Sequence, residues 1–553
     1  MDADGLLTAE RARRRVLRPG GGWRDLRAGF AADAAAHATR MGPIWHSCCD
    51  SWAAVLPDRV AVRDIGAGRD WTYGALKDAS DRLASVLQGA GVGQGDRVAV
   101  FLPQGAMVLV THFAIQKLGA IVLPLFTLFG ADALAYRLAD SGARAVVTDA
   151  ENLPKLMALR PDLPHLRTVF SLGGGTGARD LEADIAAHPP LARPVMAGPE
   201  DPAVMIYTSG TTGAPKGALH AHRFLLGHLP SMEITHDGFP RPGDCGWTPA
   251  DWAWIGGLMD MAVPCLYYGV PLVAHRFARF DPAEAWALIR DHGIRNAFLP
   301  PTALKLMRVA PDPGGVALRS VSSGGEALGP ELLDWGRAVL GCPINELYGQ
   351  TECNLVVTQA AGFMAVKPGT MGKALPGFDV AVLRPDGTDA APGEVGELAV
   401  RRGAPSMFLG YWQQPDKTAA KFTGDWMRTG DLGTCDADGY FTYVARDDDI
   451  ITSAGYRIGP SEIENCLMGD PDVVMAAAVG VPDPVRTEIV VAHVVLREGA
   501  VWSDAMAARL TDRVRVRVSP HVAPRRIFAR AALPMTATGK IIRRALRDEG
   551  VPD

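Results

Sequence analysis

The chain has 553 residues, of which 48% are hydrophobic and 21% are charged, so it must pack more than one core and is expected to fold as two or more domains. This is the composition of a soluble globular protein and excludes disordered and fibrous classes. The net charge of −5 is small for such a length, which argues against a general nucleic-acid binder.

The first two thirds of the chain alternate short β-rich runs with longer helical stretches. We expect buried strands at 96–103, 119–126, 143–149, 167–172, 271–275, 296–300 and 319–326. Apolar residues recur at helical spacing in 74–91 and 131–142. The pattern predicts an α/β fold of stacked, largely parallel sheets covered by helices.

From about Phe378 the pattern changes to strands joined by Gly, Pro and Asp turns, which predicts a small antiparallel, barrel-like subdomain over about 378–445. After Asp449, Ser461 and Glu464 have the spacing of a capping box at a helix start. Two strands and a helix follow. We therefore expect a large N-terminal domain, residues 1–447, and a small, mobile α+β C-terminal domain, residues 448–553.

Three observations bear on where the protein works. The eight cysteines show no CxxC or Cys/His ligand spacing, which favours a reduced, cytoplasmic setting. The longest apolar run, from Gly119, is interrupted by Pro124 and Gly130 and is too short to span a bilayer. The N-terminal stretch mixes arginines with acids and lacks an apolar core, so we interpret it as a solvated leader helix, not a targeting signal.

The stretch from Tyr207 to Gly217, YTSGTTGAPKG, is rich in groups that bind phosphate. Glycines let backbone N–H groups turn toward an anion, hydroxyls add donors, and a lysine supplies charge. The string is not a Walker A motif, because Pro215 precedes Lys216 and Gly217 follows it. Taken alone, such a loop could equally be a flexible surface loop. Its length and its place after a hydrophobic strand favour a polyphosphate site.

Five further strings occur downstream of this loop. They are SSGGE (322–326), ELYGQTE (346–352), RTGDLG (428–433), ARDDDIITSAGYRIGPSEIE (445–464) and PMTATGKIIRR (534–544). With the loop at Tyr207, in this order, they make the chain resemble the adenylate-forming (AMP-binding) superfamily of acyl-CoA synthetases, peptide-synthetase adenylation domains and luciferases. The resemblance runs from about Trp52 to Arg544, and the chain is most similar to short- and medium-chain acyl-CoA synthetases.

The resemblance implies a nucleotide site. Its implied ATP- and AMP-binding residues are Thr208, Ser209, Gly210, Thr211, Thr212, Gly213, Lys216, Gly325, Glu326, Glu346, Tyr348, Gln350, Thr351, Asp431, Arg446, Arg457 and Lys540. Tyr348 would stack on adenine, and the two oxygens of Asp431 would accept from the ribose hydroxyls. Arg446 would lie near the ribose and Arg457 near the phosphate. Glu352 is a hard oxygen ligand suited to Mg²⁺ carried by ATP.

The resemblance also implies four catalytic residues, which are Lys540, Glu352, Lys216 and Arg457. Lys540 would stand between the attacking carboxylate and the α-phosphate, where one cation offsets the repulsion of two anions. Asp448 corresponds to the family's hinge, about which the C-terminal domain rotates after the first step. Gly455 would then line a channel for the thiol. Thr452 stands where the family often has Lys or Asn, which leaves side-chain details of the hinge loop open.

The residues for the acid are predicted from the same alignment of motifs. Acetate-specific relatives carry an aromatic residue just before their QTE string, where this chain has Gly349, and an aliphatic one in the loop that holds Gly324. A missing indole would leave room for several methylene groups. Trp254, Gly257 and Pro301 are further candidate pocket walls. The sequence thus favours a medium-chain, branched or aromatic acid, although other side chains could refill the space.

The acceptor distinguishes the remaining alternatives. Only a short tail follows Lys540, and no carrier-type LGG-S string occurs, so free CoA is the favoured acceptor. We therefore predict an ATP- and Mg²⁺-dependent acyl-CoA synthetase that acts on small molecules, with no nucleic-acid or membrane partner and with a homodimer allowed. A stand-alone enzyme that loads a separate carrier protein, an oxygen-dependent luciferase-like enzyme and a catalytically inactive binding protein are the alternatives.

Overall fold

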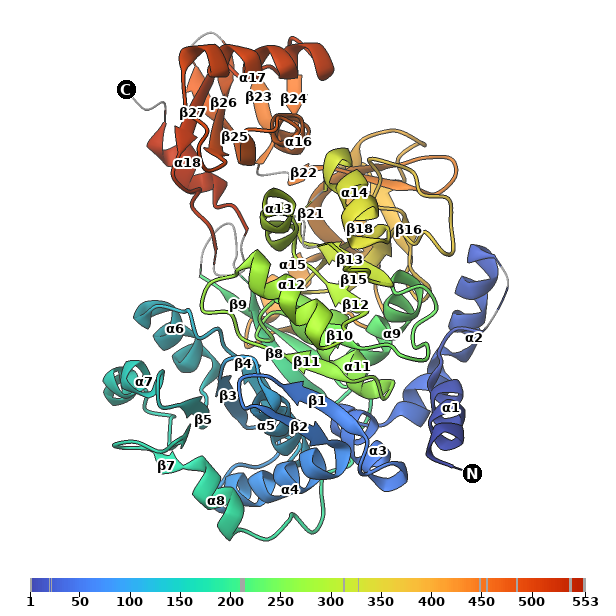
Figure 1. The fold of residues 1–553 in the computed structure, drawn as a ribbon, viewed down its shortest axis with the longest axis vertical. Helices are drawn as coiled ribbons and strands as arrows, with labels where there is room; N and C mark the ends of the chain where they lie inside the picture. The colour runs from blue at the N-terminus through green and yellow to red at the C-terminus, as the bar shows by residue number, and fades with distance from the viewer. Residues whose placement is uncertain are drawn as a thin grey trace.

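The computed structural model describes residues 2–18, 20, 22–208, 214–311, 314–326, 328–446, 449–453, 456–483, 486–536 and 540–550, and the side chains of 456 and 457 lie outside what it describes. The molecule is of the mixed α/β class. Most of the chain forms one large body, and a smaller sheet with its helices lies at one end, beside α13 and α14 (Figure 1).

One large sheet has eight strands, in the order β19-β9-β8-β4-β3-β5-β6-β7. The strands are β3 (Arg97–Phe101), β4 (Ile121–Pro124), β5 (Ala145–Asp149), β6 (Thr168–Leu172), β7 (Arg179–Asp180), β8 (Pro202–Thr208), β9 (Lys216–Ala221) and β19 (Gly410–Tyr411). Pairing is parallel from β8 to β7 and antiparallel for β9 and β19. The predicted strands and their largely parallel arrangement are confirmed.

A second large sheet has nine strands, in the order β16-β15-β14-β13-β12-β10-β11-β1-β2. The strands are β1 (Val60–Asp64), β2 (Arg69–Thr72), β10 (Gly246–Trp247), β11 (Leu272–Ala274), β12 (Asn296–Phe298), β13 (Ser320–Gly324), β14 (Ile344–Gln350), β15 (Asn354–Thr358) and β16 (Lys373–Ala374). Its central strands are parallel and its outer ones antiparallel. The SSGGE and ELYGQTE strings therefore lie at the ends of two adjacent parallel strands, β13 and β14.

Helices cover and separate these sheets. They are α3 (Ser51–Val55), α4 (Tyr73–Gly89), α5 (Ala106–Lys117), α6 (Ala131–Ser141), α7 (Leu153–Leu159), α8 (Leu181–Ala187), α9 (Phe224–Thr235), α10 (Ile255–Gly257), α11 (Val263–Tyr267), α12 (Pro282–Asp291), α13 (Pro301–Val309) and α14 (Pro330–Trp335). Every residue of α9 is buried, as is nearly all of α5. One core cluster joins residues of both sheets through these helices, so the sheets are stacked on a shared core.

The predicted β-rich subdomain is an antiparallel five-stranded sheet. It comprises β17 (Val380–Leu383), β18 (Gly396–Arg401), β20 (Phe422–Thr423), β21 (Trp426–Cys435) and β22 (Phe441–Arg446), with α15 (Pro415–Ala420) beside it. Strands β21 and β22 pair so that Asp431 lies opposite Arg446. The antiparallel pairing thus brings together two residues that the motifs place fifteen positions apart.

The C-terminal unit is a second five-stranded sheet with three helices. It comprises β23 (Ile451–Ser453), β24 (Tyr456–Ile458), α16 (Pro460–Met468), β25 (Val473–Asp483), β26 (Thr487–Leu496), α17 (Asp504–Arg517), β27 (Arg526–Arg530) and α18 (Arg543–Glu549). The predicted capping box is wrong, because Gly459 is the N-cap of α16 and no side chain caps it. Glu464 instead accepts from the Ala478 N–H and pairs with Arg543, which ties α18 to α16.

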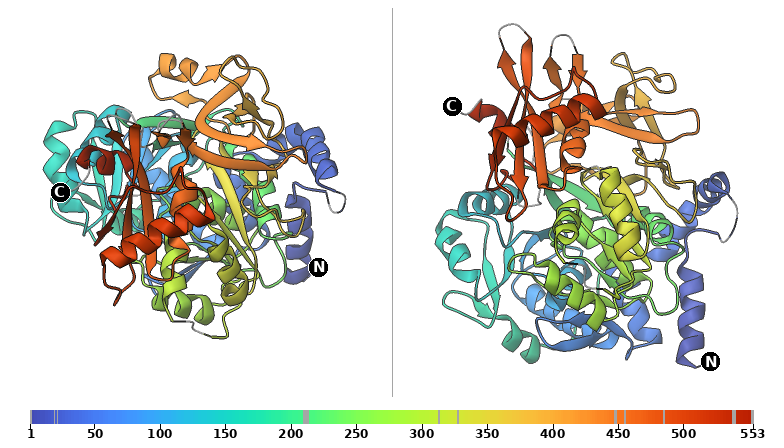
Figure 2. Two further views of the ribbon diagram at one scale, coloured as in Figure 1. Left: turned by 90° about the horizontal axis from the view of Figure 1, so that it is seen from above. Right: turned by 45° about the horizontal axis from the view of Figure 1, so that its top comes forward.

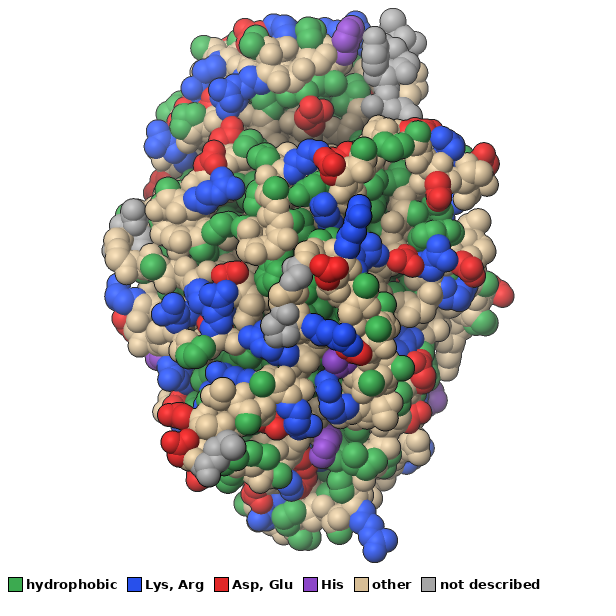
Figure 3. Space-filling model, turned by 90° about the vertical axis from the view of Figure 1, so that its right-hand side faces the viewer, with side chains coloured by type: hydrophobic (Ala, Val, Ile, Leu, Met, Phe, Trp, Pro, Cys, Tyr) green, Lys and Arg blue, Asp and Glu red, His purple; other side chains and the backbone are tan. Residues whose placement is uncertain are grey.

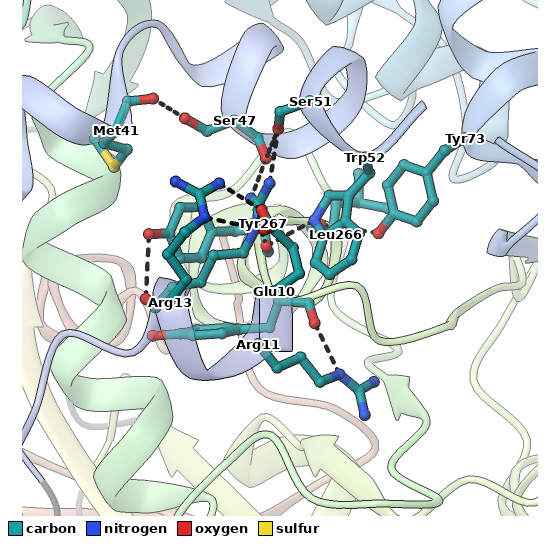
Figure 4. A network of polar contacts seen from close by, with 12 residues as sticks. Glu10, Arg11, Arg13, Met41, Ser47, Ser51, Trp52, Tyr73, Leu266 and Tyr267 are labelled. Atoms are coloured by element: carbon teal, nitrogen blue, oxygen red, sulfur yellow. Dashed lines mark hydrogen bonds and ion pairs between the residues drawn. The ribbon is translucent and has the colours of Figure 1, made fainter. Parts of the chain in front are cut away.

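The N-terminal helices α1 (Ala3–Arg14) and α2 (Trp23–Met41) are not a solvated leader, in contrast to the sequence-based expectation. Arg14 is buried, and its guanidinium donates to the carbonyls of Ser47 and Tyr267 at 2.6 and 2.9 Å and lies 4.4 Å from the ring centre of Trp52. Figure 4 shows the nearby Trp52 and Tyr267, whose carbonyl accepts from the Trp52 indole N–H at 2.9 Å. The N-terminal segment is therefore fastened to the large body.

The views in Figure 2 place α1 and α2 along one side of the large body, away from the C-terminal unit. On the face seen in Figure 3, positive and negative side chains are interspersed. Within the described ranges, no helix combines the length and the apolar character that a membrane crossing needs.

Candidate functional site

The base of the phosphate-binding loop is a β-hairpin. Thr208 at the end of β8 lies opposite Lys216 at the start of β9, and its hydroxyl lies 3.5 Å from the Lys216 carbonyl. Two tyrosines fix this base to α6, because Tyr207 donates to Asp140 at 2.6 Å and Tyr136 donates to the Pro215 carbonyl at 3.0 Å. The predicted ligands Ser209, Gly210, Thr211, Thr212 and Gly213 lie outside the described residues.

Next to this hairpin, Lys216, Tyr411 and Glu352 form a compact group. The Lys216 ammonium lies 4.4 Å from the ring centre of Tyr411, whose hydroxyl donates to Glu352 Oε1 at 2.5 Å. Burial lowers the pKa of Lys216, and the charge of Glu352 opposes that shift. Tyr411 lies in none of the motifs and was not predicted to belong to the site. It reaches the site because β19 pairs with β9, nearly two hundred residues earlier, and no local pattern encodes that pairing.

A second group surrounds Asp431, which is buried. Its Oδ2 accepts from the Tyr348 hydroxyl at 2.7 Å and from the Gln350 side-chain amide at 2.6 Å, while the Arg446 guanidinium lies 3.3 Å from Oδ1. Burial raises the pKa of the Asp431 carboxyl, and Arg446, the two hydrogen bonds and the charge of Lys540 oppose the increase. Asp431 therefore has several donors and cations around it before any ligand is considered.

The predicted adenine side of the site lies at the ends of β13 and β14. Glu326 pairs with Lys305 of α13 at 2.9 Å, next to Gly325, whose φ of +110° suits glycine. Glu346 accepts from the Leu328 N–H at 2.9 Å, and burial raises the pKa of its carboxyl to about 7. Thr351, which directly follows β14, is partly exposed. The loop after β13 is thus held from two sides.

At three glycines predicted to line the acyl pocket, an added side chain would meet backbone atoms. A Cβ at Gly349 would overlap the carbonyl oxygen of Asn354, which folds against it at a β-bulge. A Cβ at Gly324 would lie 2.8 Å from the Leu347 oxygen, and one at Gly257 would lie 2.5 Å from the Ala250 oxygen. The inference that a missing side chain at Gly349 opens space is therefore wrong at that position, because backbone occupies it.

The other two pocket candidates are placed differently. Trp254 is partly exposed and packs against Phe298, with ring centres 5.8 Å apart. The edge of its indole comes within 4 Å of where a Cβ on Gly325 would lie, so it borders the loop of the adenine side. Pro301 is buried at the first position of α13. Of the two, only Trp254 is partly exposed and borders the loop that holds Gly325.

Lys540 comes from the C-terminal unit. It is exposed, the Thr536 N–H donates to the Lys540 carbonyl at 2.8 Å, and Met535 bridges to Ile541. The charge of Lys540 opposes the burial that raises the pKa of the Asp431 carboxyl. Asp448 and Gly455 lie outside the described residues, and so does the side chain of Arg457, whose backbone belongs to β24.

The described residues contain no group of three or more His, Cys, Asp or Glu side chains that could hold a metal ion. A single buried carboxylate, Glu352, stands beside the phosphate hairpin. This arrangement suits Mg²⁺, which commonly binds to one or two carboxylates together with substrate phosphates. Glu352 would hold such an ion, and the ion would neutralise charge on the polyphosphate.

Comparison with known proteins covers both parts of the chain. Residues 49–412 match the family model described as AMP-binding enzyme, and residues 462–540 match the model of the AMP-binding enzyme C-terminal domain. The acetyl-coenzyme A synthetase of Bacillus subtilis (strain 168) is 34% identical over 504 residues, which cover 89% of this chain and 87% of that protein.

Two more matches extend the comparison. The rat mitochondrial acyl-coenzyme A synthetase ACSM2 is 35% identical over 495 residues, covering 87% of this chain and 86% of the relative. Among solved structures, the anthranilate CoA ligase AuaEII in complex with anthranoyl-AMP aligns with a TM-score of 0.84 and 26% identity, over 92% of this chain and 97% of that one. The similarity thus extends over nearly the full length of these proteins.

Proposed function

The chain belongs to the AMP-binding enzyme family and is an AMP-forming carboxylic acid–CoA ligase, and from that premise we propose how its site works. In the first step a substrate carboxylate attacks the α-phosphorus of ATP, which forms an acyl-adenylate and releases pyrophosphate. In the second step the CoA thiol, on losing its proton, attacks the acyl carbonyl, which forms acyl-CoA and releases AMP.

The observation that carries this proposal is that four charged groups from distant parts of the chain gather around one site. Lys216 and Glu352 lie beside the phosphate hairpin, and Asp431 lies beneath Tyr348 with Lys540 nearby. Lys216 would hold the leaving pyrophosphate, and Asp431 would bind the ribose. Lys540 would stabilise the transition state of the first step, where charge develops between two anions.

We propose that the acid is medium-chain, branched or aromatic. The support is the partly exposed indole of Trp254, which packs on the buried Phe298 and offers an apolar surface beside Gly325. Relatives include a ligase crystallised with an aromatic acyl-adenylate. Another relative is an acetyl-coenzyme A synthetase, so acetate is the alternative that a test must address.

A carboxylate panel tests both the reaction and the acid. The enzyme would be supplied with ATP, Mg²⁺, CoA and one acid at a time, from acetate to decanoate with branched acids and benzoate, and AMP release would be measured. We expect medium-chain, branched or aromatic acids to give the highest kcat/KM. Acetate as the best substrate would overturn the acid assignment but not the reaction.

The acceptor can be tested in the same assay. The alternative is that the enzyme loads the phosphopantetheine thiol of a separate carrier protein. Formation of a free acyl-CoA at a rate matching pyrophosphate release supports CoA as acceptor. Pyrophosphate release that stays at a single turnover with free CoA would favour the carrier-protein alternative.

Three further features belong to the proposal. Residues 1–447 and 448–553 would act as two domains that rotate about Asp448 between steps, with Gly455 then lining the thiol channel. The setting would be reduced and cytoplasmic, which the eight free cysteines support. A homodimer is compatible with the chain, and light scattering of the purified protein would measure its state.

A further inference from the structure

The C-terminal unit touches the large body through a small polar contact away from Lys540. Glu331, in the first turn of α14, lies 3.5 Å from Arg513 and 3.9 Å from Arg517, both on α17. Arg308 of α13 donates to the Met468 carbonyl at 3.1 Å, at the C-terminal end of α16. A cation at that end of a helix is favourable, because the helix dipole is negative there.

This contact is specific enough to fix the orientation of the C-terminal unit relative to the large body. Arg513 is mostly buried and is also held by the Cys466 carbonyl, to which its Nε donates at 2.7 Å. Gly469 lies beneath the ion pair, and a Cβ there would overlap both the Glu331 carboxylate and the Arg513 guanidinium. A side chain at residue 469 would therefore displace the ends of both side chains from their present positions.

The same rigid unit carries this contact and Lys540. Helices α16 and α17 share a core with β25 and β26, and α18, which follows the Lys540 turn, packs on the other face of the same strands. Any rotation that withdraws Lys540 from Asp431 must therefore also separate Arg513 from Glu331. The Glu331–Arg513 ion pair and the approach of Lys540 to Asp431 therefore occur in the same arrangement of the C-terminal unit and the large body.

The geometry points to Glu331, Arg513 and Arg517 as an interdomain latch that favours the arrangement used for adenylation. This inference rests on the proposed two-step function and assigns positioning residues to it. A partly exposed ion pair is worth little, so the latch can open in each cycle. The strength of the ion pair would set what fraction of the enzyme is in the arrangement for adenylation and what fraction is in the arrangement for thioester formation.

Charge reversal separates the latch from a merely structural role. Glu331→Arg should slow ATP–pyrophosphate exchange about threefold, the effect that a partly exposed ion pair supports. It should leave thioester formation from supplied acyl-adenylate and CoA unchanged or faster. Adding Arg513→Glu to Glu331→Arg should restore the exchange. Gly469→Ala, which places a methyl group under the pair, should act like Glu331→Arg.

Arg515 supplies the matched control, because it lies on the same helix but pairs with Asp512. Arg515→Ala should leave the ratio of the two half-reactions unchanged, whereas Arg513→Ala should shift it. Equal loss of both half-reactions in Glu331→Arg, or no rescue by the double reversal, would overturn the latch.

A measurement without substrates keeps this inference separate from the proposed function. Hydrogen–deuterium exchange of the substrate-free protein should rise in 329–335 and 460–469 on Glu331→Arg and fall again in the double variant. If wild-type enzyme exchanged no pyrophosphate with any acid, the proposed function would fail while this measurement still decided the latch. Unchanged protection in every variant would refute it.

Discussion

The two halves of the site differ in how firmly they are held. Tyr348 and Gln350 are bound to Asp431 through short hydrogen bonds inside the large body, with Arg446 beside them. Lys540 stands on an exposed turn of a separate unit that touches the large body through polar contacts. In the proposed reaction, the groups needed in both steps are thus held within the large body, while the group needed in only one step comes from the C-terminal unit.

The largest expected effect comes from removing that withdrawing group. Lys540→Ala should reduce ATP–pyrophosphate exchange by at least about a hundredfold, because a preorganised cation at the developing charge is lost. Thioester formation from supplied acyl-adenylate and CoA should stay within about threefold of wild type, since Lys540 has left by then. An equal loss of activity in both half-reactions would show that Lys540 does not act in adenylation alone.

A smaller effect is expected within the fixed half. Tyr411→Phe removes the hydrogen bond to Glu352, and a bond to a charged group supports a loss of about tenfold in adenylation. The Mg²⁺ concentration needed for half-maximal exchange should also rise, because the carboxylate is less well oriented. Tyr440→Phe, which loses a bond to the Ala365 carbonyl elsewhere, is the control. Unchanged Mg²⁺ dependence would remove Tyr411 from the metal-binding role.

The smallest effect concerns the stability of the large body. Burial raises the pKa of Glu233 to about 7, well above its usual value, although Tyr268 and the N–H groups of Val16 and Leu17 donate to it. The folded state then keeps a proton that the unfolded state releases, so stability falls as pH rises from about 4.5 to about 7 and is level above.

Replacing Glu233 tests this pH dependence. In Glu233→Gln, Tm should decline a few degrees less than wild-type Tm between pH 5 and pH 7.5, as calorimetry would measure. Part of the decline should persist, because the buried Glu346 carboxyl also has a raised pKa. Identical pH profiles in the two proteins would contradict the assignment to Glu233.

Much of the fold and of the nucleotide site was predictable because its signals are local. Apolar runs marked strands in both large sheets, and three of the motifs, those at 207–217, 322–326 and 346–352, begin or end at such strands. Asp431 and Arg446 were both identified from short strings, and antiparallel pairing then set them opposite each other. A short motif was sufficient to predict a site residue wherever it specified both the residue type and its position in the chain.

The failures share a dependence on contacts distant in sequence. Tyr411 enters the site through a two-residue strand paired with β9, and Gly349 is filled by the Asn354 carbonyl at a bulge. Ser461 and Glu464 have the spacing of a capping box, but Glu464 is used by Ala478 and Arg543. In each case the partner that decides the role of the residue is set by tertiary packing.

The fastening of the N-terminal helices has a practical consequence for dividing this protein into parts. The AMP-binding match begins at residue 49, yet Phe30 is almost fully buried before that point, and Arg14 lies against Trp52 after it. A chain started at residue 49 would uncover apolar surface and leave the Glu233 carboxylate without two of its backbone donors. We expect such a truncated protein to aggregate during expression, so the family boundary is not the folding boundary.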